Sequence, residues 1–315
     1  MRLAVIIPVF NGATTVNAAI TSALKQKLDE PFEVIVVDDG STDATPEVLA
    51  GFDSKIKVVT QANGGLSAAR NAGATATASD NEYLAFLDAD DVWLPDKLAS
   101  SLPPFDLHPE AVLLYTDVQS VDDQDSPLPL SSMPPRETHA PSMNDLLSRW
   151  WPIIPSTVVV RRSAFEGCGR FCESFRGAGG HEDVDFWLRM RELGEFIYLD
   201  RSLVKYRVVA GANPMLKYQT NFELFEGRVT ERYGRRGQPL LASMRHGYAT
   251  ALSHHGLMEL ERGDRIGARR AFLSALRYKP SHFKSVFRLA RTFLPAALAQ
   301  ALASGSRRRG YQPDR

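Results

Sequence analysis

The chain has 315 residues, which corresponds to about two domains of roughly 150 residues or to one large domain. Its composition, 44% hydrophobic and 23% charged, is that of a soluble globular protein with enough apolar residues for a buried core. The 37 Lys and Arg balance the 37 Asp and Glu, which argues against a protein that coats nucleic acid, and we expect no nucleic-acid partner.

The first 120 residues alternate apolar β-branched runs with helical patterns. The runs are continuously apolar, as expected of strands covered on both faces in a parallel sheet with right-handed crossovers. The predicted strands are Leu3–Val9, Val34–Val37, Ile56–Val59, Tyr83–Leu87 and Val112–Tyr115, and the predicted helices are Thr14–Lys25, Thr45–Ala50 and Ser67–Thr77.

Residues 118–141 are rich in Asp, Ser and Pro, which predicts a surface excursion without a helix or strand. Order is expected to return with a strand at Thr157–Val160 and a helix at Val184–Leu193. Two further strands are predicted at Phe196–Leu199 and Leu203–Val209.

The last 75 residues show helical periodicity only. Gly263-Asp264 separates two predicted helices, Lys279-Pro280 ends the second, and the pair resembles a single tetratricopeptide-type hairpin. A third helix is predicted over Phe283–Ala303, kinked at Pro295. The expected domains are residues 1–215 (halves 1–117 and 118–215), a helical region at 216–303, and a basic, disordered tail at 304–315.

The chain is expected in the cytoplasm. No run approaches the 18 or so apolar residues of a spanning helix, and the N-terminal run contains Pro8, unlike a secretory signal. Two cysteines, Cys168 and Cys172, do not make a disulfide framework. The Arg307–Arg309 tail is expected to be a solvated end, and its place beside an apolar helix leaves peripheral contact with the inner face of a membrane as the alternative.

Carboxylates follow two of the predicted strands. Asp38 and Asp39 come after Val34–Val37, and Asp88, Asp90 and Asp91 come after Tyr83–Leu87. In a parallel sheet both groups project from the same edge, where a hard cation bound to a diphosphate would offset their charge. The alternative is that these aspartates only cap turns.

Two further segments carry polar side chains at predicted helix starts. Asn63–Asn71 is a glycine turn that opens a helix bearing Arg70, so that amides and a guanidinium favour an anion such as phosphate. His181-Glu182-Asp183 opens the helix with Trp187, and one of its carboxylates is a candidate general base. The alternative for both is a simple helix start with acids favoured by the dipole.

Taken in order, these segments resemble the family 2 glycosyltransferases, inverting enzymes with the GT-A fold. The resemblance rests on Ile7–Gly12, Val37–Asp43, Asn63–Asn71, Phe86–Asp91 and His181–Asp183, and covers about residues 1–210. It implies an α/β fold with a mostly parallel sheet flanked by helices, followed here by a helical extension. It also implies a nucleotide-diphosphate-sugar donor, Mg²⁺ or Mn²⁺ as cofactor, and a glycan or lipid-linked acceptor.

The resemblance assigns roles to the following residues. Pro8, Phe10 and Asp39 would surround the base, Arg70 would lie near the phosphates, and Asp88 would contact the ribose. Asp90 would ligate the metal with support from Asp91. Asp183 would be the general base, with Glu182 and Trp187 as supporting residues on the acceptor side.

One departure from the family pattern is visible. Many relatives carry a histidine two residues beyond a Tyr-Arg pair, but here Tyr206-Arg207 is followed by two valines, so His181 or water would replace it. Two alternative functions remain open: a sugar-phosphate nucleotidyltransferase, whose glycine-rich signature is missing, and a non-catalytic module that binds a partner through its C-terminal helices.

Overall fold

The computed structural model describes residues 3–128, 139–175, 180–208 and 221–293. The chain forms two units: unit 1 comprises Met1–Ala212 and Thr220–Leu240, and unit 2 comprises Asn213–Gln219 and Leu241–Arg315. The expected boundaries near 215 and 303 fall outside the described residues, and the expected division at 117/118 falls inside a strand, so the domain assignment stays a prediction. None of the helices in the described part of the chain is long and apolar enough to cross a bilayer.

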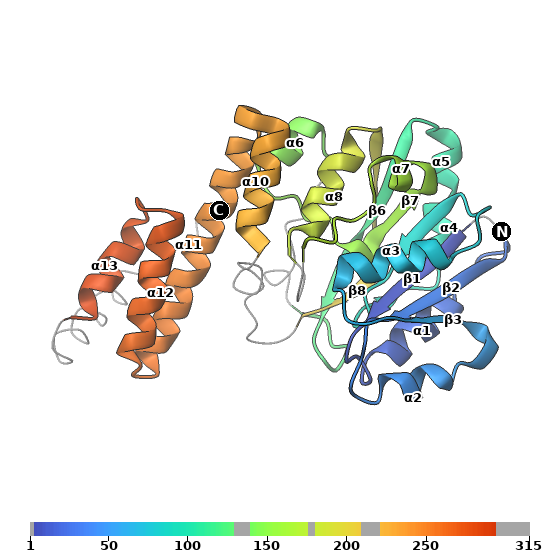
Figure 1. Ribbon diagram of the computed structural model, residues 1–315, viewed down its shortest axis with the longest axis horizontal. Coiled ribbons are helices and arrows are strands. Elements are labelled where there is room, and N and C mark those ends of the chain that lie inside the picture. The colour runs from blue at the N-terminus through green and yellow to red at the C-terminus, as the bar shows by residue number, and fades with distance from the viewer. Residues whose placement is uncertain (1–2, 129–138, 176–179, 209–220, 294–315) are drawn as a thin grey trace. The chain divides into compact units, whose positions relative to one another are not determined.

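Unit 1 is built on an eight-stranded sheet with the order β3-β2-β1-β4-β7-β6-β8-β5 among the described residues (Figure 1). The pairs β1/β2, β1/β4, β2/β3 and β6/β8 are parallel, whereas β4/β7, β6/β7 and β5/β8 are antiparallel. The strands are β1 (Leu3–Val9), β2 (Phe32–Asp38), β3 (Lys57–Thr60), β4 (Tyr83–Phe86), β5 (Val92–Trp93), β6 (Ala111–Val121), β7 (Val158–Arg161) and β8 (Glu195–Arg207). The sheet is therefore mixed, with its parallel N-terminal half as predicted.

Helices cover both faces of this sheet. One face packs against α1 (Val16–Leu24), α2 (Thr45–Ala50), α4 (Lys97–Ser101) and α5 (Pro103–Leu107) through a continuous apolar core. The other face packs against α3 (Leu66–Ala76), α7 (Arg162–Gly167) and α8 (Glu182–Arg191), in front of the sheet in Figure 1. On that side Phe171 stacks on Phe186 with ring centroids 4.1 Å apart and meets Phe86 edge-on at 5.3 Å.

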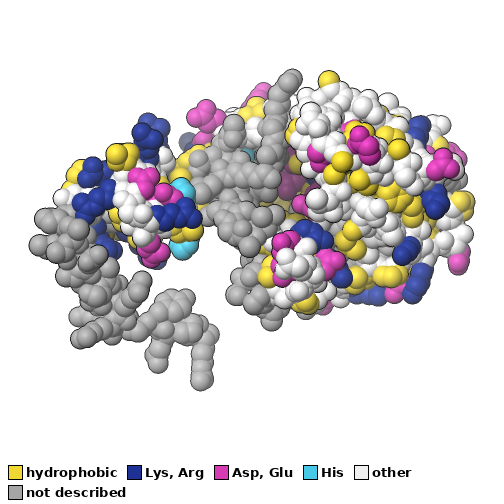
Figure 2. Space-filling model, turned by 90° about the horizontal axis from the view of Figure 1, so that it is seen from below, with side chains coloured by type: hydrophobic (Ala, Val, Ile, Leu, Met, Phe, Trp, Pro, Cys, Tyr) yellow, Lys and Arg dark blue, Asp and Glu magenta, His cyan; other side chains and the backbone are white. Residues whose placement is uncertain are grey.

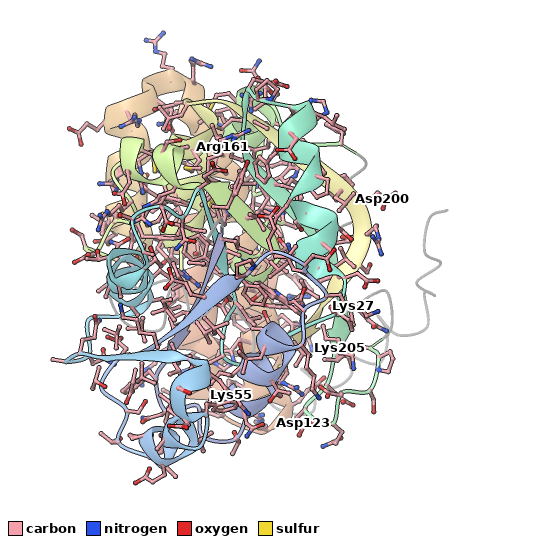
Figure 3. The ribbon with its side chains drawn as sticks, turned by 90° about the vertical axis from the view of Figure 1, so that its right-hand side faces the viewer. Lys27, Lys55, Asp123, Arg161, Asp200 and Lys205 are labelled. Atoms are coloured by element: carbon pink, nitrogen blue, oxygen red, sulfur yellow. The ribbon has the colours of Figure 1, made fainter. Side chains whose placement is uncertain are left out.

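Arg161 on β7 shows how the antiparallel half is tied to the rest. Its guanidinium donates to the carbonyl oxygens of Ala111 and Phe105 and to the hydroxyl of Tyr83. In Figure 3 it lies within the fold, while Lys27, Asp123 and Asp200 lie at the outside. A half-buried cation with its donors satisfied in this way holds β7 between β4 and β6.

Four differences from the predicted strands have physical causes. β3 is the edge strand and largely exposed, so the expectation of two covered faces is wrong there. β6 continues to Val121, inside the predicted excursion, because it pairs with β8 over that length. β8 is one strand rather than two, with register shifts in its ladder to β6. β5 is a two-residue strand without a sequence pattern.

Several short elements complete unit 1. They are η1 (Asp53–Lys55), α6 (Met143–Ser148), η3 (Pro155–Thr157), α10 (Phe222–Tyr233) and η5 (Gly234–Gly237). α6 begins with a capping box in which the Ser142 hydroxyl and the Asp145 carboxylate each accept from the other's backbone amide. α10 lies in the region 216–303 that was expected to be helical, although no separate helix was predicted there. It is attached to α8 by ion pairs of Arg228 with Asp185 and of Arg232 with Glu192.

Unit 2 contains most of α11 (Gln238–Glu261), with α12 (Arg265–Tyr278) and α13 (Phe283–Arg291). α11 and α12 separate at Gly263-Asp264 as predicted, and the Asp264 side chain caps α12 by accepting from the amides of Ile266 and Gly267. The two helices pack through Tyr248 on Tyr278, with ring centroids 5.0 Å apart. Helix α13 ends at Arg291, before the predicted end at Ala303; residues 294–315, including Pro295 and Arg307–Arg309, lie outside the described residues. The tetratricopeptide resemblance stays a prediction.

Candidate functional site

The carboxyl ends of β1, β2 and β4 meet at one edge of the sheet. Phe10 follows β1, Asp39 follows β2 and Asp88 follows β4, and β1 lies between the other two strands. Since neighbouring strands are about 4.8 Å apart, the chain positions of Asp39 and Asp88 lie roughly 10 Å apart across the sheet. This spacing leaves room for an extended ligand along the edge.

The end of β1 presents an aromatic ring at this edge. Pro8 is buried within the strand, whereas Phe10 is 51% exposed. The next residue, Asn11, has φ 52°, and its side-chain oxygen accepts from the amide of Thr42 while its own amide donates to Ser41. The loops after β1 and β2 are therefore joined, and the Phe10 ring is left accessible.

Asp39 holds the loop that leads into α3. Its carboxylate is buried and accepts from the Gln61 side chain at 2.7 Å and from the amides of Gly64 and Gly65 at 2.8 Å each. Gly65 has φ 87°, a conformation that favours glycine, and is the residue before the first turn of α3. Asp39 thereby fixes where α3 begins.

Arg70 on α3 joins two acidic segments that are far apart in the sequence. Its guanidinium is 1% exposed and contacts Asp88 Oδ1 through Nη2 at 2.8 Å and Glu182 Oε1 through Nη1 at 3.4 Å. Burial alone would lower the pKa of Arg70, but the charges of Asp88 and Glu182 raise it by more, so the pKa is raised overall. The Nη atoms of Arg70 thus face two carboxylates, and its expected place near the phosphates of a donor stays a prediction.

A serine connects the members of the aspartate cluster after β4. The Ser156 hydroxyl on η3 donates to Asp91 Oδ2 at 2.5 Å and accepts from the amide of Asp88 at 3.0 Å. Asp91 is buried and its other oxygen accepts from the amide of Arg207 at the end of β8. Asp91 therefore holds the aspartate turn from inside, and its expected role in supporting a metal site stays a prediction.

Arg207, at the end of β8, also contacts the turn that carries the aspartate cluster. Its Nε donates to the carbonyl oxygen of Asp90 at 3.0 Å, and its Nη2 forms an ion pair with Asp125 at 2.6 Å. The Asp90 residue itself is exposed. The turn that carries Asp88, Asp90 and Asp91 is thus fixed by contacts to β8 and η3.

The start of α8 brings Glu182 and Asp183 to this region. His181 precedes the helix with φ 72°, and its ring stacks on Phe225 of α10 at 4.9 Å. Glu182 is buried and also accepts from the amide of Gly180, while Asp183 Oδ1 accepts from the amide of Val184 at 2.7 Å. With Arg70 as the link, α8 is anchored at the edge that carries Asp88.

Two carboxyls of the site are shifted towards the protonated form. Burial, followed by the charge of Glu182, raises the pKa of Asp183 to about 7. Burial, followed by the charges of Asp90 and Asp88, raises the pKa of Asp91 well above its usual value. A carboxyl that titrates near neutral pH is suited to general acid–base chemistry.

Three tryptophans of unit 1, Trp150, Trp151 and Trp187, differ in their exposure. Trp187 is buried, and its indole N–H donates to the carbonyl oxygen of Ile153, so it supports α8 by packing. Trp151 is also buried, with its N–H on the Tyr115 hydroxyl, whereas Trp150 is exposed. Of these, only Trp150 has a surface available to a ligand.

The residues present suit a cation shared with a ligand rather than a closed metal cage. Within the described ranges, no group of three or more His, Cys, Asp and Glu side chains is arranged to hold a metal ion. Asp88 keeps its side chain 25% exposed and Asp90 is exposed, so two carboxylates remain accessible. One or two carboxylates completed by phosphate oxygens and water is a donor set that fits Mg²⁺ or Mn²⁺.

Ser156 and Arg207 were missed as site residues in the sequence. Ser156 lies in no motif, and no local pattern predicts the hydrogen bond from its hydroxyl to Asp91, which is 65 residues away in the sequence. Arg207 belongs to the Tyr-Arg pair, which marked the region, but its contacts to Asp90 and Asp125 depend on the pairing of β8. Gln61, the partner of Asp39, lies two residues before the predicted glycine turn, and this position was its only signal in the sequence.

Comparison with known proteins places this chain among glycosyltransferase sequences. The family model described as "Glycosyl transferase family 2" matches residues 4–169. An uncharacterized glycosyltransferase of Rickettsia prowazekii is 28% identical over 214 residues, which are 66% of this chain and 64% of that protein. The succinoglycan biosynthesis protein ExoW of Rhizobium meliloti is 30% identical over 182 residues, covering 52% of this chain and 56% of ExoW. The chain thus spans less than two thirds of these relatives.

Solved structures share the fold. The crystal structure of S. aureus TarS 1–349 superimposes with a TM-score of 0.60 at 20% identity, covering 100% of this chain and 94% of that one. The same TarS segment in complex with UDP-GlcNAc gives a TM-score of 0.59 at 18% identity. The predicted fold class, an α/β sheet flanked by helices with a C-terminal helical extension, is confirmed.

Proposed function

Since the chain belongs to glycosyl transferase family 2, we propose that it moves a sugar from a nucleotide-diphosphate donor to a hydroxyl of a glycan or lipid-linked acceptor. The transfer is a single displacement that inverts the anomeric carbon. The family model matches residues 4–169, which carry nearly all of β1–β7 but neither β8 nor Asp183, and the geometry at the sheet edge supports the reaction. The proposal includes UDP-GlcNAc among the donors to test, because TarS was solved in complex with it.

The donor nucleotide would lie along the ends of β1, β2 and β4. Phe10 offers an accessible ring for the base, next to Pro8 in the strand. Asp39 would act mainly by holding the loop between β3 and α3, since three donors already occupy its carboxylate. Asp88, partly exposed and oriented by Arg70, would accept hydrogen bonds from the ribose.

Asp183 would remove the proton from the acceptor hydroxyl. As the acceptor oxygen bonds to the anomeric carbon, the bond from that carbon to the diphosphate oxygen breaks, the proton passes to the Asp183 carboxylate, and the nucleoside diphosphate leaves. The raised pKa of about 7 makes Asp183 a stronger base than an ordinary aspartate when it is ionised. A positioned base of this kind contributes about 10²–10⁴ in rate.

Asp90, with Asp88 beside it, would hold a Mg²⁺ or Mn²⁺ ion against the diphosphate. The ion would supply Lewis-acid stabilisation of the departing negative charge. Asp91, Ser156 and Arg207 act on this part of the site by fixing the turn that carries Asp90.

One observation carries the proposal. The Arg70 guanidinium contacts Asp88, after β4, and Glu182, at the start of α8, although 112 residues separate Arg70 from Glu182. This contact brings the proposed donor side and the proposed base to one edge of the sheet. A transferase that works by direct displacement needs both at one centre.

The test is release of nucleoside diphosphate from a panel of UDP-, GDP- and TDP-sugars with Mn²⁺ or Mg²⁺. Thermal stabilisation by each donor selects the pairs to assay, because a ligand that binds the folded state raises the melting temperature. Metal-dependent release that is lost in Asp183→Asn supports the proposal. Stabilisation without release from any donor would support the non-catalytic alternative, and formation of a sugar nucleotide from a sugar phosphate and a nucleoside triphosphate would support a nucleotidyltransferase.

A further inference from the structure

Helix α13 in unit 2 turns its apolar side chains outward. Phe283 is 82% exposed, Phe287 62% and Phe293, just beyond the helix, 66%. With Val286, these residues repeat at helical spacing and form one stripe, which we call the α13 face. Aromatic side chains of this size are the most costly to leave in water.

The buried side of the same helix is polar. Ser285 and Thr292 are fully buried, and His282 is nearly so. His282 Nδ1 lies 2.7 Å from the Ser285 hydroxyl, and Arg269 of α12 donates to the Thr292 hydroxyl at 3.0 Å. The usual arrangement of an amphipathic helix on a globular core is reversed, so the α13 face is not the side that holds unit 2 together.

The segment that carries this face is strongly basic. Residues 241–293 contain ten Arg and Lys but only three Asp and Glu, in a chain whose charges balance overall. Lys284 is exposed beside the stripe, and Arg269 stacks over the Phe293 ring at 4.1 Å. Figure 2 shows Lys and Arg next to hydrophobic side chains on the part of the molecule that contains α12 and α13.

We propose that the α13 face docks on the surface of a bilayer that contains anionic phospholipids. The exposed phenylalanines would enter the boundary between headgroups and acyl chains, and the surrounding Arg and Lys would meet the phosphates. A helix with an apolar stripe and basic flanks binds membranes in this way, parallel to the surface. This proposal concerns unit 2 and does not depend on the proposed sugar transfer.

The charge argues against the other occupants. A second copy of the chain would bring two basic segments together, and like charges in contact oppose association. A nucleic acid duplex would match the charge, but it presents phosphates and sugars and no apolar surface to the phenylalanine rings. A lipid surface matches both the charge and the apolar stripe.

The experiment measures binding of the full chain to vesicles by co-sedimentation. Vesicles of phosphatidylcholine alone are compared with vesicles of phosphatidylcholine and phosphatidylglycerol, at low and at high salt. We expect binding to the mixed vesicles that weakens with salt. The double variant Phe283→Ser/Phe287→Ser should bind at least about tenfold more weakly, since each ring would lose its apolar contact. Lys284→Ala should bind about fivefold more weakly, the effect of one basic residue near an anionic surface.

A matched control separates the stripe from general stickiness. Leu107 on α5 is 79% exposed and lies in unit 1, so Leu107→Ser should bind like the unchanged protein. Circular dichroism of each variant checks that the helices are retained. Failure of the unchanged protein to bind mixed vesicles overturns the proposal, as does unaltered binding by the phenylalanine variant. A dimer in light scattering that the phenylalanine variant no longer forms would show that a second copy of the chain covers the α13 face instead. Equally tight DNA binding by the unchanged protein and by the phenylalanine variant would show that the segment binds through its charge alone.

Discussion

Replacing Asp183 by Asn should stabilise the protein while abolishing sugar transfer. Asn keeps the size of the side chain and an oxygen that accepts from the amide of Val184, but it has no charge. In the folded chain, burial and the charge of Glu182 make ionisation of Asp183 costly, and they raise its pKa to about 7. In the unfolded chain the same carboxyl titrates near its usual value of about 3.9.

The sign and size of the effect follow from this difference. Because the folded pKa is raised, the folded state holds its proton more tightly, and stability is lost as pH rises from about 4 to about 7. About three pKa units at 1.36 kcal/mol each give a loss of up to about 4 kcal/mol above pH 7. Asn does not ionise, so Asp183→Asn should gain stability over the unchanged protein progressively across this range and then level off.

The assay is urea unfolding of both proteins from about pH 5 to about pH 8, with the Asp123→Asn variant as control. Asp123 is exposed, at the periphery in Figure 3, so its variant controls for the loss of one negative charge. The kcat/KM of the unchanged protein should rise with pH through about 7, since this ratio reports the free enzyme, in which only ionised Asp183 can take the proton. If the unfolding free energies of Asp183→Asn and of the unchanged protein change in parallel with pH, the pKa of Asp183 is not raised in the folded state. Near-normal turnover by Asp183→Asn would refute the role of Asp183 as the base.

Three further changes test the rest of the site and its frame. Asp90→Ala should weaken metal-dependent binding of nucleoside diphosphate at least about tenfold, because the attraction between one carboxylate and a unit positive charge is about 4 kcal/mol at ~4 Å. An unchanged calorimetric titration with metal and nucleoside diphosphate would contradict this. Ser156→Ala should lower stability in urea by about 1–3 kcal/mol, since buried Asp91 loses a donor, and an unaltered midpoint would show that the hydrogen bond is unimportant. Gly73→Ala should cost about 1–3 kcal/mol, because the new Cβ would lie 2.5 Å from a side chain of β1. Gly227→Ala, on α10 with nothing within 4 Å, is the control and should be neutral or slightly stabilising.

The parallel half of the sheet was predictable because its signals are local. The apolar run at Leu3–Val9 and the short helix Thr45–Ala50 have the same bounds in the sequence pattern and in the structure. A strand buried on both faces must be apolar throughout, so its ends are visible where polar residues begin. The same reasoning failed for β3, since an edge position depends on the order of strands, which a local pattern does not contain.

The second half of the sheet was less predictable because its pairings are not local. Val118–Val121 lie in a stretch with the composition of a loop, and they are strand only through the ladder to β8. Asp200 and Arg201 interrupt the apolar pattern of β8, which led to two predicted strands instead of one. Tertiary pairing overrides propensity at such positions.

The site itself divides in the same way. The motifs placed Asp39, Asp88 and Asp183 at the ends of elements, which a pattern can show. The contact of Arg70 with Glu182, which joins two of these ends, spans 112 residues and follows from the packing of α3 and α8 on one face of the sheet. No spacing rule predicts a contact of that kind.

The electrostatics of the site link the proposed base to the proposed cation. Arg70 offsets the charges of Asp88 and Glu182, while the pKa of Asp183 is raised by burial and by Glu182, with Asp88 contributing. At neutral pH the chain therefore relieves part of the repulsion with a proton on a carboxyl that must be ionised to act. A divalent cation beside Asp88 would relieve the same repulsion and lower the pKa of Asp183. Under the proposed mechanism, binding of the donor with its cation would thus also put the base in its working form.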